Sequence, residues 1–188
     1  MGLIEPRRLS LRDQPPVTLR TATPEDAASI LDLSLGISRE DGFTVSEPDE
    51  IVQEMESRRR DLTEYRDSPD RLWIVAAADA LVVGELDIAA MPRRRMNHRA
   101  RLGLNVRDGW RGKGIGRAMI RAALDWAAAQ PAIRKVELGV MAGNTGAIAL
   151  YRSLGFEEEG RRRMAFRFPS GRCEDDILMA LILKPAAE

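Results

Sequence analysis

The chain has 188 residues, 44% of them hydrophobic and 31% charged, a composition typical of a globular protein with a complete core. Lys plus Arg and Asp plus Glu both number 29, so the charge balance gives no reason to expect a nucleic-acid partner. No apolar run approaches the length of a membrane span, and no apolar signal segment opens the chain, which predicts a cytoplasmic protein without a membrane partner.

The first third of the chain predicts an arm, one strand and two helices. Residues 1–16 are rich in arginine and proline and lack periodicity, so we expect an irregular N-terminal arm. Residues 17–22 alternate like a short strand, and Thr23 then caps a helix that continues to Ile37. An acid-rich start predicts a second helix over 46–65, with apolar positions at Ile51, Met55 and Leu62.

The rest of the chain predicts a sheet with two more helices. Apolar residues alternate with period two in three successive segments, 71–79, 80–91 and 98–106. A glycine-rich loop follows, and then a helix over 117–130, a strand over 134–140, a second helix that begins at Asn144 and has Gly155 as its C′ residue, and a closing strand pair, 156–168 and 175–183. Without an internal repeat or long linker, this order predicts one mixed α/β (α+β) domain over residues 17–188.

The glycine-rich loop "RGKGIG" runs from Arg111 to Gly116 at the start of a predicted helix. Unpaired N–H groups and partial positive charge at a helix N-terminus suit a phosphate group, and glycine lets it come close. A Walker P-loop is absent, and the dinucleotide pattern G-x-G-x-x-G fails because its sixth position is Arg117. The pattern that fits is R-x-x-G-x-G, formed by Arg111, Gly114 and Gly116.

Three segments together resemble the GNAT N-acetyltransferase superfamily: "LGLNVRDGWRGKGIGRAMI", "ELGVMAGNTGAIALYRSLGF" and "DDILMALIL". The second contains the pattern N-x-x-A-x-x-L-Y-x-x-x-G-F, at Asn144, Ala147, Leu150, Tyr151, Gly155 and Phe156. The resemblance extends from about Val17 to Leu183 and is greatest to single-domain bacterial members that acetylate amino acids, small amines or protein N-termini. It implies a mostly antiparallel twisted sheet with helices on both faces and a splayed strand pair that forms the CoA cleft.

The resemblance also implies acetyl-CoA as co-substrate and direct attack by an amine within a ternary complex. The residues that would hold the CoA diphosphate are Arg111, Gly112, Lys113, Gly114, Ile115, Gly116 and Arg117. The backbone of Leu104, Asn105 and Val106 would bind the pantetheine arm and polarise the thioester carbonyl. Asn144 would contact the CoA arm, although its position also suits a helix N-cap, and both roles can hold together.

Tyr151 matches the family tyrosine that protonates the departing CoA thiolate, which would make it the catalytic acid. Its spacing also fits a core aromatic on the stripe formed by Ile148 and Leu154. The general base stays unassigned, because relatives that acetylate protein N-termini often carry a glutamate where this chain has Gly139. Other candidates for the base are Glu137, Glu85, His98 and a chain of water molecules.

The acceptor itself is not encoded in any motif. The resemblance makes residues 42–52 the acceptor-facing segment and a small-molecule amine or amino acid the expected substrate. Two alternatives are a protein N-terminal or lysine acetyltransferase, and a CoA-binding sensor without catalysis. A homodimer is expected by the same resemblance. A metal is not expected, because His98 and Cys173 are the only residues of their types.

Overall fold

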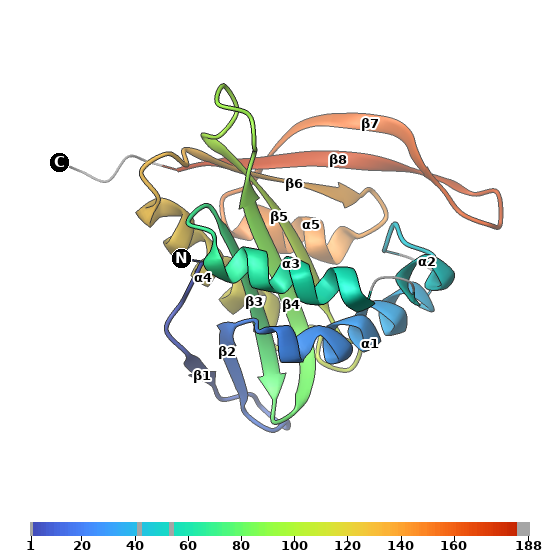
Figure 1. Ribbon diagram of the computed structural model, residues 1–188. Helices are drawn as coiled ribbons and strands as arrows, with labels where there is room; N and C mark the ends of the chain where they lie inside the picture. The colour runs from blue at the N-terminus through green and yellow to red at the C-terminus, as the bar shows by residue number, and fades with distance from the viewer. Residues whose placement is uncertain (1, 41–42, 53–54, 184–188) are drawn as a thin grey trace.

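The computed structural model describes residues 2–40, 43–52 and 55–183 (Figure 1). Its strands are β1 (Arg7–Leu9), β2 (Val17–Thr21), β3 (Arg71–Ala78), β4 (Leu81–Ala90), β5 (Arg99–Val106), β6 (Lys135–Met141), β7 (Glu157–Arg167) and β8 (Cys173–Ile182). Its helices are α1 (Ala27–Ser38), preceded by a 3-10 turn at Pro24–Asp26, α2 (Pro48–Val52), α3 (Met55–Asp67), α4 (Ile115–Ala129) and α5 (Thr145–Ser153).

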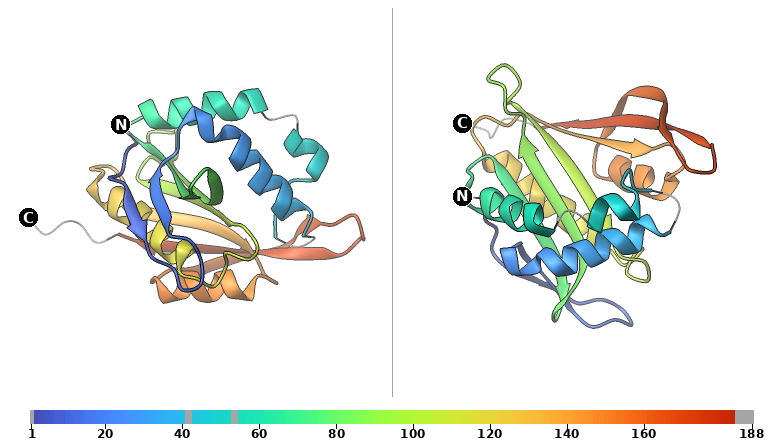
Figure 2. Two further views of the ribbon diagram at one scale, coloured as in Figure 1. Left: turned by 90° about the horizontal axis from the view of Figure 1, so that it is seen from below. Right: turned by 45° about the vertical axis from the view of Figure 1, so that its right-hand side comes forward.

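The strands form one eight-stranded sheet in the order β1-β2-β3-β4-β5-β6-β8-β7. Every neighbouring pair is antiparallel except β5 and β6, which run parallel. Helices α1 and α3 cover one face of the sheet, and α4 and α5 cover the other (Figure 2). The mixed, mostly antiparallel fold with helices on both faces is therefore confirmed.

Strands β5 and β6 separate soon after they begin. Their pairing joins Arg99, Ala100 and Arg101 to Lys135, Val136 and Glu137, respectively. Beyond these pairs β5 continues to Val106 and β6 to Met141, each still bonded to its other neighbour. Backbone groups along the inner edges of both strands are thus left without a strand partner, which creates the splay that the family resemblance implied.

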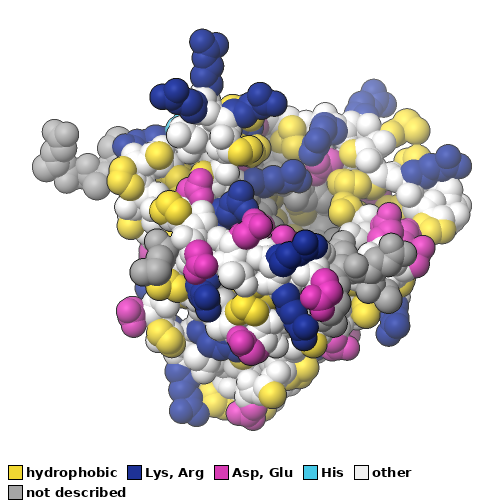
Figure 3. All heavy atoms as spheres, viewed as in Figure 1, with side chains coloured by type: hydrophobic (Ala, Val, Ile, Leu, Met, Phe, Trp, Pro, Cys, Tyr) yellow, Lys and Arg dark blue, Asp and Glu magenta, His cyan; other side chains and the backbone are white. Residues whose placement is uncertain are grey.

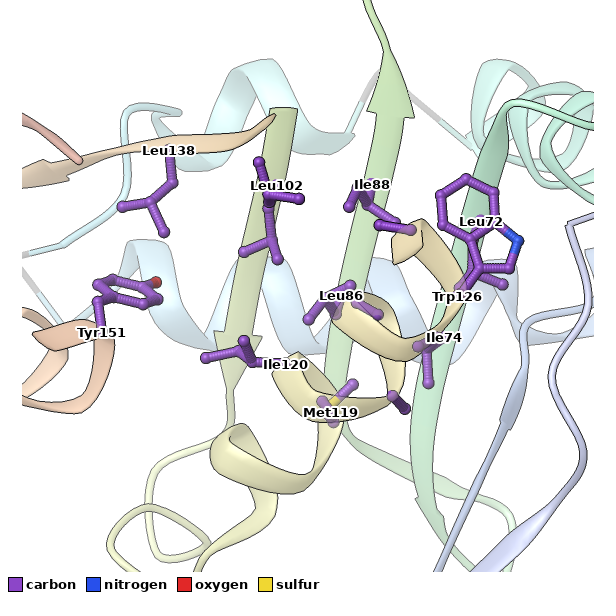
Figure 4. Close-up of a cluster of buried hydrophobic side chains, with 14 of the residues drawn as sticks. Leu72, Ile74, Leu86, Ile88, Leu102, Met119, Ile120, Trp126, Leu138 and Tyr151 are labelled. Carbon is purple, nitrogen blue, oxygen red and sulfur yellow. The ribbon is translucent and has the colours of Figure 1, made fainter. Parts of the chain in front are cut away.

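Each face of the sheet has its own buried cluster. On one face, Met119, Ile120 and Trp126 of α4 pack on apolar side chains of β3, β4 and β5 (Figure 4). On the other, α1 and α3 cover Trp73 and Val75 with Ile30, Leu33 and Leu62. Both sides of the central strands are therefore buried, so these strands are held firmly enough to position a site at the splay.

Two predictions about the first third of the chain were incomplete. The arm contains a short strand, β1, whose three residues pair with the edge of β2. The segment predicted as one helix over 46–65 forms α2 and α3, and residues 53–54 between them lie outside the described part. Ile51 and Leu62 are buried as predicted, whereas the Met55 side chain is not described.

The surface carries charges of both signs, interspersed on the face drawn in Figure 3. Lys and Arg side chains stand out at the tip of the loop between β4 and β5, where Arg93, Arg94 and Arg95 are exposed. Among the described residues, no helix is both long and apolar enough to cross a membrane.

Candidate active site

A cleft of about 620 Å³ opens where β5 and β6 separate, and we call it the main cleft. Its walls come from the diverging halves of both strands, from the loop before α4, and from α5. Residues that belong to distant parts of the sequence, such as Leu104, Gly139 and Tyr151, meet there. The main cleft is therefore a product of the splay.

The loop before α4 presents bare backbone to the main cleft. Gly112 and Gly114 have φ of +73° and +87°, and a Cβ atom at either position would meet nothing within 4 Å. In the described part of the chain, the N–H groups of Gly112, Gly114 and Gly116 donate to no other group. Left-handed glycines and free N–H groups at a helix N-terminus form a fitting site for a phosphate group.

The inner edge of β5 offers further donors. Arg107 N–H donates to Val83 O at 2.8 Å, and pairing in an antiparallel ladder alternates along the strand. The N–H groups of Leu104 and Val106 therefore point away from β4 and toward the gap beside β6. This arrangement can bind the polar groups of an extended chain that lies between the two strands.

Tyr151 projects from α5 toward the same gap. Its hydroxyl points between Leu138 of β6 and Leu102 of β5 (Figure 4). The ring packs on Phe156, with centroids 5.8 Å apart. Beyond the end of α5, Gly155 turns the chain with φ +91°, and the Phe156 N–H donates to Tyr151 O at 3.1 Å. Burial raises the pKa of Tyr151 to about 12, so its hydroxyl keeps the proton at neutral pH.

All but one of the predicted cofactor-binding residues line the main cleft; the exception is Lys113. The Arg111 side chain donates to Val106 O at 2.8 Å and pairs with Glu40 at 2.6 Å, so it braces the loop. Arg117 donates to Ser153 Oγ at 2.8 Å. Asn144 caps α5 through a 3.1 Å bond from Ala147 N–H, which confirms the N-cap interpretation.

A smaller cavity of about 280 Å³, here called the side chamber, shares Gly103, Leu104 and Asn105 with the main cleft. Phe43 and Val45, from the predicted acceptor-facing segment, line both cavities, whereas Gly42 lies outside the described residues. Other side chains in its wall belong to α1, α3, β3 and β4. The side chamber therefore lies on the face of the sheet opposite Tyr151, because α1 and α3 cover that face.

Glu85 lines the side chamber but is already fully engaged. Its Oε1 accepts bonds from Asn105 at 3.1 Å and Ser34 at 3.4 Å, and its Oε2 accepts one from the Trp73 indole at 3.2 Å. Burial raises the pKa of Glu85, although these donors favour its ionised form. Because its three donors belong to three different elements, the Glu85 carboxylate mainly holds these elements together in the wall of the side chamber.

Asp87, two residues further along β4, was not among the predicted site residues although it shares a strand face with Glu85. The Tyr65 hydroxyl donates to its Oδ2 at 3.4 Å. Burial, and then the nearby Glu85 charge, raise the pKa of Asp87 to about 6. The period of two could have identified it, because Glu85 was already a candidate.

The other base candidates lie less favourably. Glu137 forms a bidentate ion pair with Arg99, at 2.7 and 2.9 Å, and His98 is exposed and outside the walls of both cavities. The space beside Gly139 is filled from β8, since a Cβ atom there would lie 2.7 Å from Asp176 Oδ1. Among the described residues, no group of three or more His, Cys, Asp or Glu side chains could hold a metal ion.

Comparison with known proteins agrees with this geometry. The L-amino acid N-acetyltransferase AaaT of Escherichia coli is 32% identical over 117 residues, which cover 62% of this chain and 71% of that protein. A crystal structure of a GNAT-family acetyltransferase from Streptococcus pneumoniae superposes with a TM-score of 0.84 and 26% identity, over 89% of this chain and 99% of that one.

The fold alone is shared with yncA of Salmonella typhimurium, a putative acetyltransferase solved with its cofactor acetyl-CoA, at 19% identity and a TM-score of 0.79 over 92% and 96% of the two chains. The model of the acetyltransferase (GNAT) family matches residues 38–156, which include α4, α5 and the splayed strands. The chain therefore belongs to the acetyltransferase (GNAT) family.

Proposed function

We propose that this protein transfers the acetyl group of acetyl-CoA to the primary amine of a small molecule or an amino acid, with both substrates bound together. The observation that carries the proposal is the main cleft, in which free glycine N–H groups, the inner edge of β5 and the Tyr151 hydroxyl all line one channel. Acetyl-CoA offers a matching series of groups: a diphosphate, an amide-rich arm and a thioester. The solved yncA structure with acetyl-CoA supports the choice of this ligand.

Each part of the main cleft has a role in this proposal. The N–H groups of Gly112, Gly114 and Gly116 bind the diphosphate, assisted by the N-terminal dipole of α4. The Leu104 and Val106 N–H groups bind the arm and polarise the thioester carbonyl, which becomes negatively charged in the transition state. Tyr151 gives its proton to the departing sulfur, since burial keeps the hydroxyl protonated.

The side chamber is the proposed acceptor site. It joins the main cleft at Gly103, Leu104 and Asn105, so an amine bound there can approach the thioester. Glu85 and Asp87 give the chamber negative charge that attracts an ammonium group, and Arg58, which lies over the Trp73 ring at 5.3 Å from its centroid, adds a positive charge to the same wall. This mixture of charges favours an amino acid, in agreement with the activity that the name of AaaT states for that relative.

The test is release of free thiol from acetyl-CoA, followed with a thiol-reactive dye across amino acids, polyamines, aminoglycosides and short peptides. Release that depends on single amino acids or small amines is the expected result. Release only with peptides or proteins would favour the protein acetyltransferase alternative. Binding of acetyl-CoA by calorimetry without release for any acceptor would favour the sensor, and no binding would refute the cleft assignment.

The cellular setting completes the proposal. We propose a cytoplasmic homodimer; the reducing compartment is supported by a single cysteine, Cys173, which is exposed and free. Light scattering at two protein concentrations measures the oligomeric state directly, and a monomer at both would remove the dimer from the proposal.

A further inference from the structure

The carboxylate of Asp87 lies at the junction between the two cavities. Asp87 is paired with Gly103 across β4 and β5, and a Cβ atom on Gly103 would lie 2.6 Å from Asp87 Oδ1. Gly103 lines both the main cleft and the side chamber. The absence of a side chain at Gly103 thus leaves room for the Asp87 carboxylate. Gly103 directly precedes Leu104, whose N–H faces the gap between β5 and β6.

We propose that Asp87 is the general base of the reaction and accepts a proton from the ammonium group of the acceptor. This inference rests on the proposed function and goes beyond it by assigning the base. The position of the carboxylate is decisive, because a base must come within hydrogen-bond reach of the proton that it removes. Of the four carboxylates in this region, Glu85, Asp87, Glu137 and Asp176, it is Asp87 that lies beside Gly103 at the junction and is not fully engaged.

The other three carboxylates are each engaged or enclosed. Glu85 accepts three hydrogen bonds, Glu137 forms a bidentate ion pair, and Asp176 Oδ1 has less than 1 Å² of exposed surface. Asp87 lines the side chamber, is half-buried and, from the described residues, receives one long bond, from Tyr65 to Oδ2. Its carboxylate can therefore accept a bond from a ligand without giving up a strong one.

The charges around Asp87 suit a base that works near neutral pH. Glu85 on its own strand opposes its ionisation, whereas Arg58 and the Tyr65 hydroxyl, both on α3, favour it. Burial is the largest influence, and the resulting pKa of about 6 leaves Asp87 ionised at pH 7 yet more basic than a free aspartate. Two neighbouring carboxylates in unequal surroundings are a recurring feature of acid–base sites.

Asp87 and Tyr151 lie on opposite faces of the sheet, which separates the two proton transfers. Asp87 takes one proton from the ammonium group, and the neutral amine forms the C–N bond as the C–S bond breaks. The sulfur leaves with the bonding electron pair and takes the Tyr151 proton. The second proton from the nitrogen returns to the tyrosinate, and Asp87 releases its own proton to solvent, so both residues are restored.

The test compares Asp87→Asn with the wild type and with Asp79→Asn, which changes an exposed aspartate in the turn between β3 and β4. The wild type is assayed first with the acceptor that gives thiol release. At pH 7 we expect kcat of Asp87→Asn to fall about 100-fold, with an unchanged Kd for acetyl-CoA. Asp79→Asn should match the wild type in both.

The pH profile separates a base from a structural residue. Wild-type kcat/KM should decline below about pH 6 as Asp87 takes up a proton. Asp87→Asn should lack this decline, and its deficit should shrink to a few-fold near pH 10, because the acceptor then loses its proton without help. A deficit that stays constant from pH 6 to pH 10 would show a structural role and overturn the assignment.

Gly103→Ala provides a second test in which residue 87 is still an aspartate. Its Cβ atom would displace the carboxylate, so we expect reduced kcat with unchanged acetyl-CoA binding. Full activity of Asp87→Asn would overturn the inference and leave the proposed function intact, whatever the activity of Gly103→Ala. A wild type that binds acetyl-CoA but acetylates nothing would overturn both.

Discussion

Replacement of Tyr151 by phenylalanine removes one oxygen atom from a buried site. The ring would keep its packing on Phe156, at 5.8 Å between centroids. In the described part of the chain the hydroxyl has no hydrogen-bond partner, so its loss leaves no buried group unsatisfied. We therefore expect the free energy of unfolding to change by less than about 0.5 kcal/mol.

The effect on turnover follows from the two pKa values. Burial raises the pKa of Tyr151 to about 12, whereas an ordinary thiol titrates near 8.5, so complete proton transfer is uphill by about 5 kcal/mol at 1.36 kcal/mol per unit. We therefore expect the hydroxyl to act first as a hydrogen-bond donor to the developing thiolate, with its proton transferred as the second proton of the amine passes to the tyrosine oxygen. We expect kcat to fall about 100-fold, at the lower end of the range for general acids, or about 2.7 kcal/mol.

The assay is acceptor-dependent thiol release, with the Kd of acetyl-CoA measured by calorimetry on the same protein. The expected pattern is a lower kcat with an unchanged Kd. Wild-type kcat in Tyr151→Phe would refute the acid role and leave Tyr151 as a core aromatic. A large rise in Kd would mean that the hydroxyl binds the substrate in the ground state, which also contradicts the reasoning.

Three further predictions concern backbone shape and charge. Gly114→Ala should weaken acetyl-CoA binding in calorimetry and cost about 1–2 kcal/mol of stability, because φ is +87° although a Cβ atom would clash with nothing; an unchanged Kd would contradict the loop assignment. Gly155→Ala, at φ +91°, should cost about 1 kcal/mol in denaturant unfolding and lower kcat through the position of Tyr151, whereas full stability would mean that the helix end tolerates a side chain. Because the pKa of Asp87 is raised to about 6, its contribution to stability is complete below about pH 4 and is lost as the pH rises through 6. Between pH 4 and pH 7, the free energy of unfolding of Asp87→Asn should therefore rise by about 2–3 kcal/mol relative to that of the wild type. Plots of unfolding free energy against pH that stay parallel for the two proteins would refute this.

Most of the fold could be predicted because its elements carry local patterns. The alternation in residues 98–106 and the helical stripe of Ile115, Met119, Ala122 and Trp126 correspond to β5 and to the buried face of α4. Gly155 was predicted as the residue just after α5 and has the required positive φ. Strand β1 escaped prediction because three residues at a sheet edge, two of them exposed arginines, have no period to detect.

Part of the candidate site could likewise be predicted from local sequence patterns, and part could not. The loop before α4 is one contiguous motif, so its cleft-facing residues were identifiable, apart from Lys113, whose orientation depends on the turn. The side chamber is assembled by strand register from segments that are far apart in the sequence. Which carboxylate remains available there depends on partners such as Trp73 and Asn105, and no local pattern reveals them.

Gly139 and Gly103 show why the absence of an acidic side chain at one strand position does not mean that a carboxylate is absent from that place in the fold. Gly139 has no side chain, yet the Asp176 carboxylate from β8 fills the space beside it. Gly103 has no side chain either, and the Asp87 carboxylate from β4 fills the space beside that one. Since neighbouring strands supply side chains to the same face, a residue on an adjacent strand can place its carboxylate at the same point in the fold. The absence of a glutamate at position 139 is therefore compatible with acid–base catalysis, provided that register brings another carboxylate to the junction, as it does for Asp87.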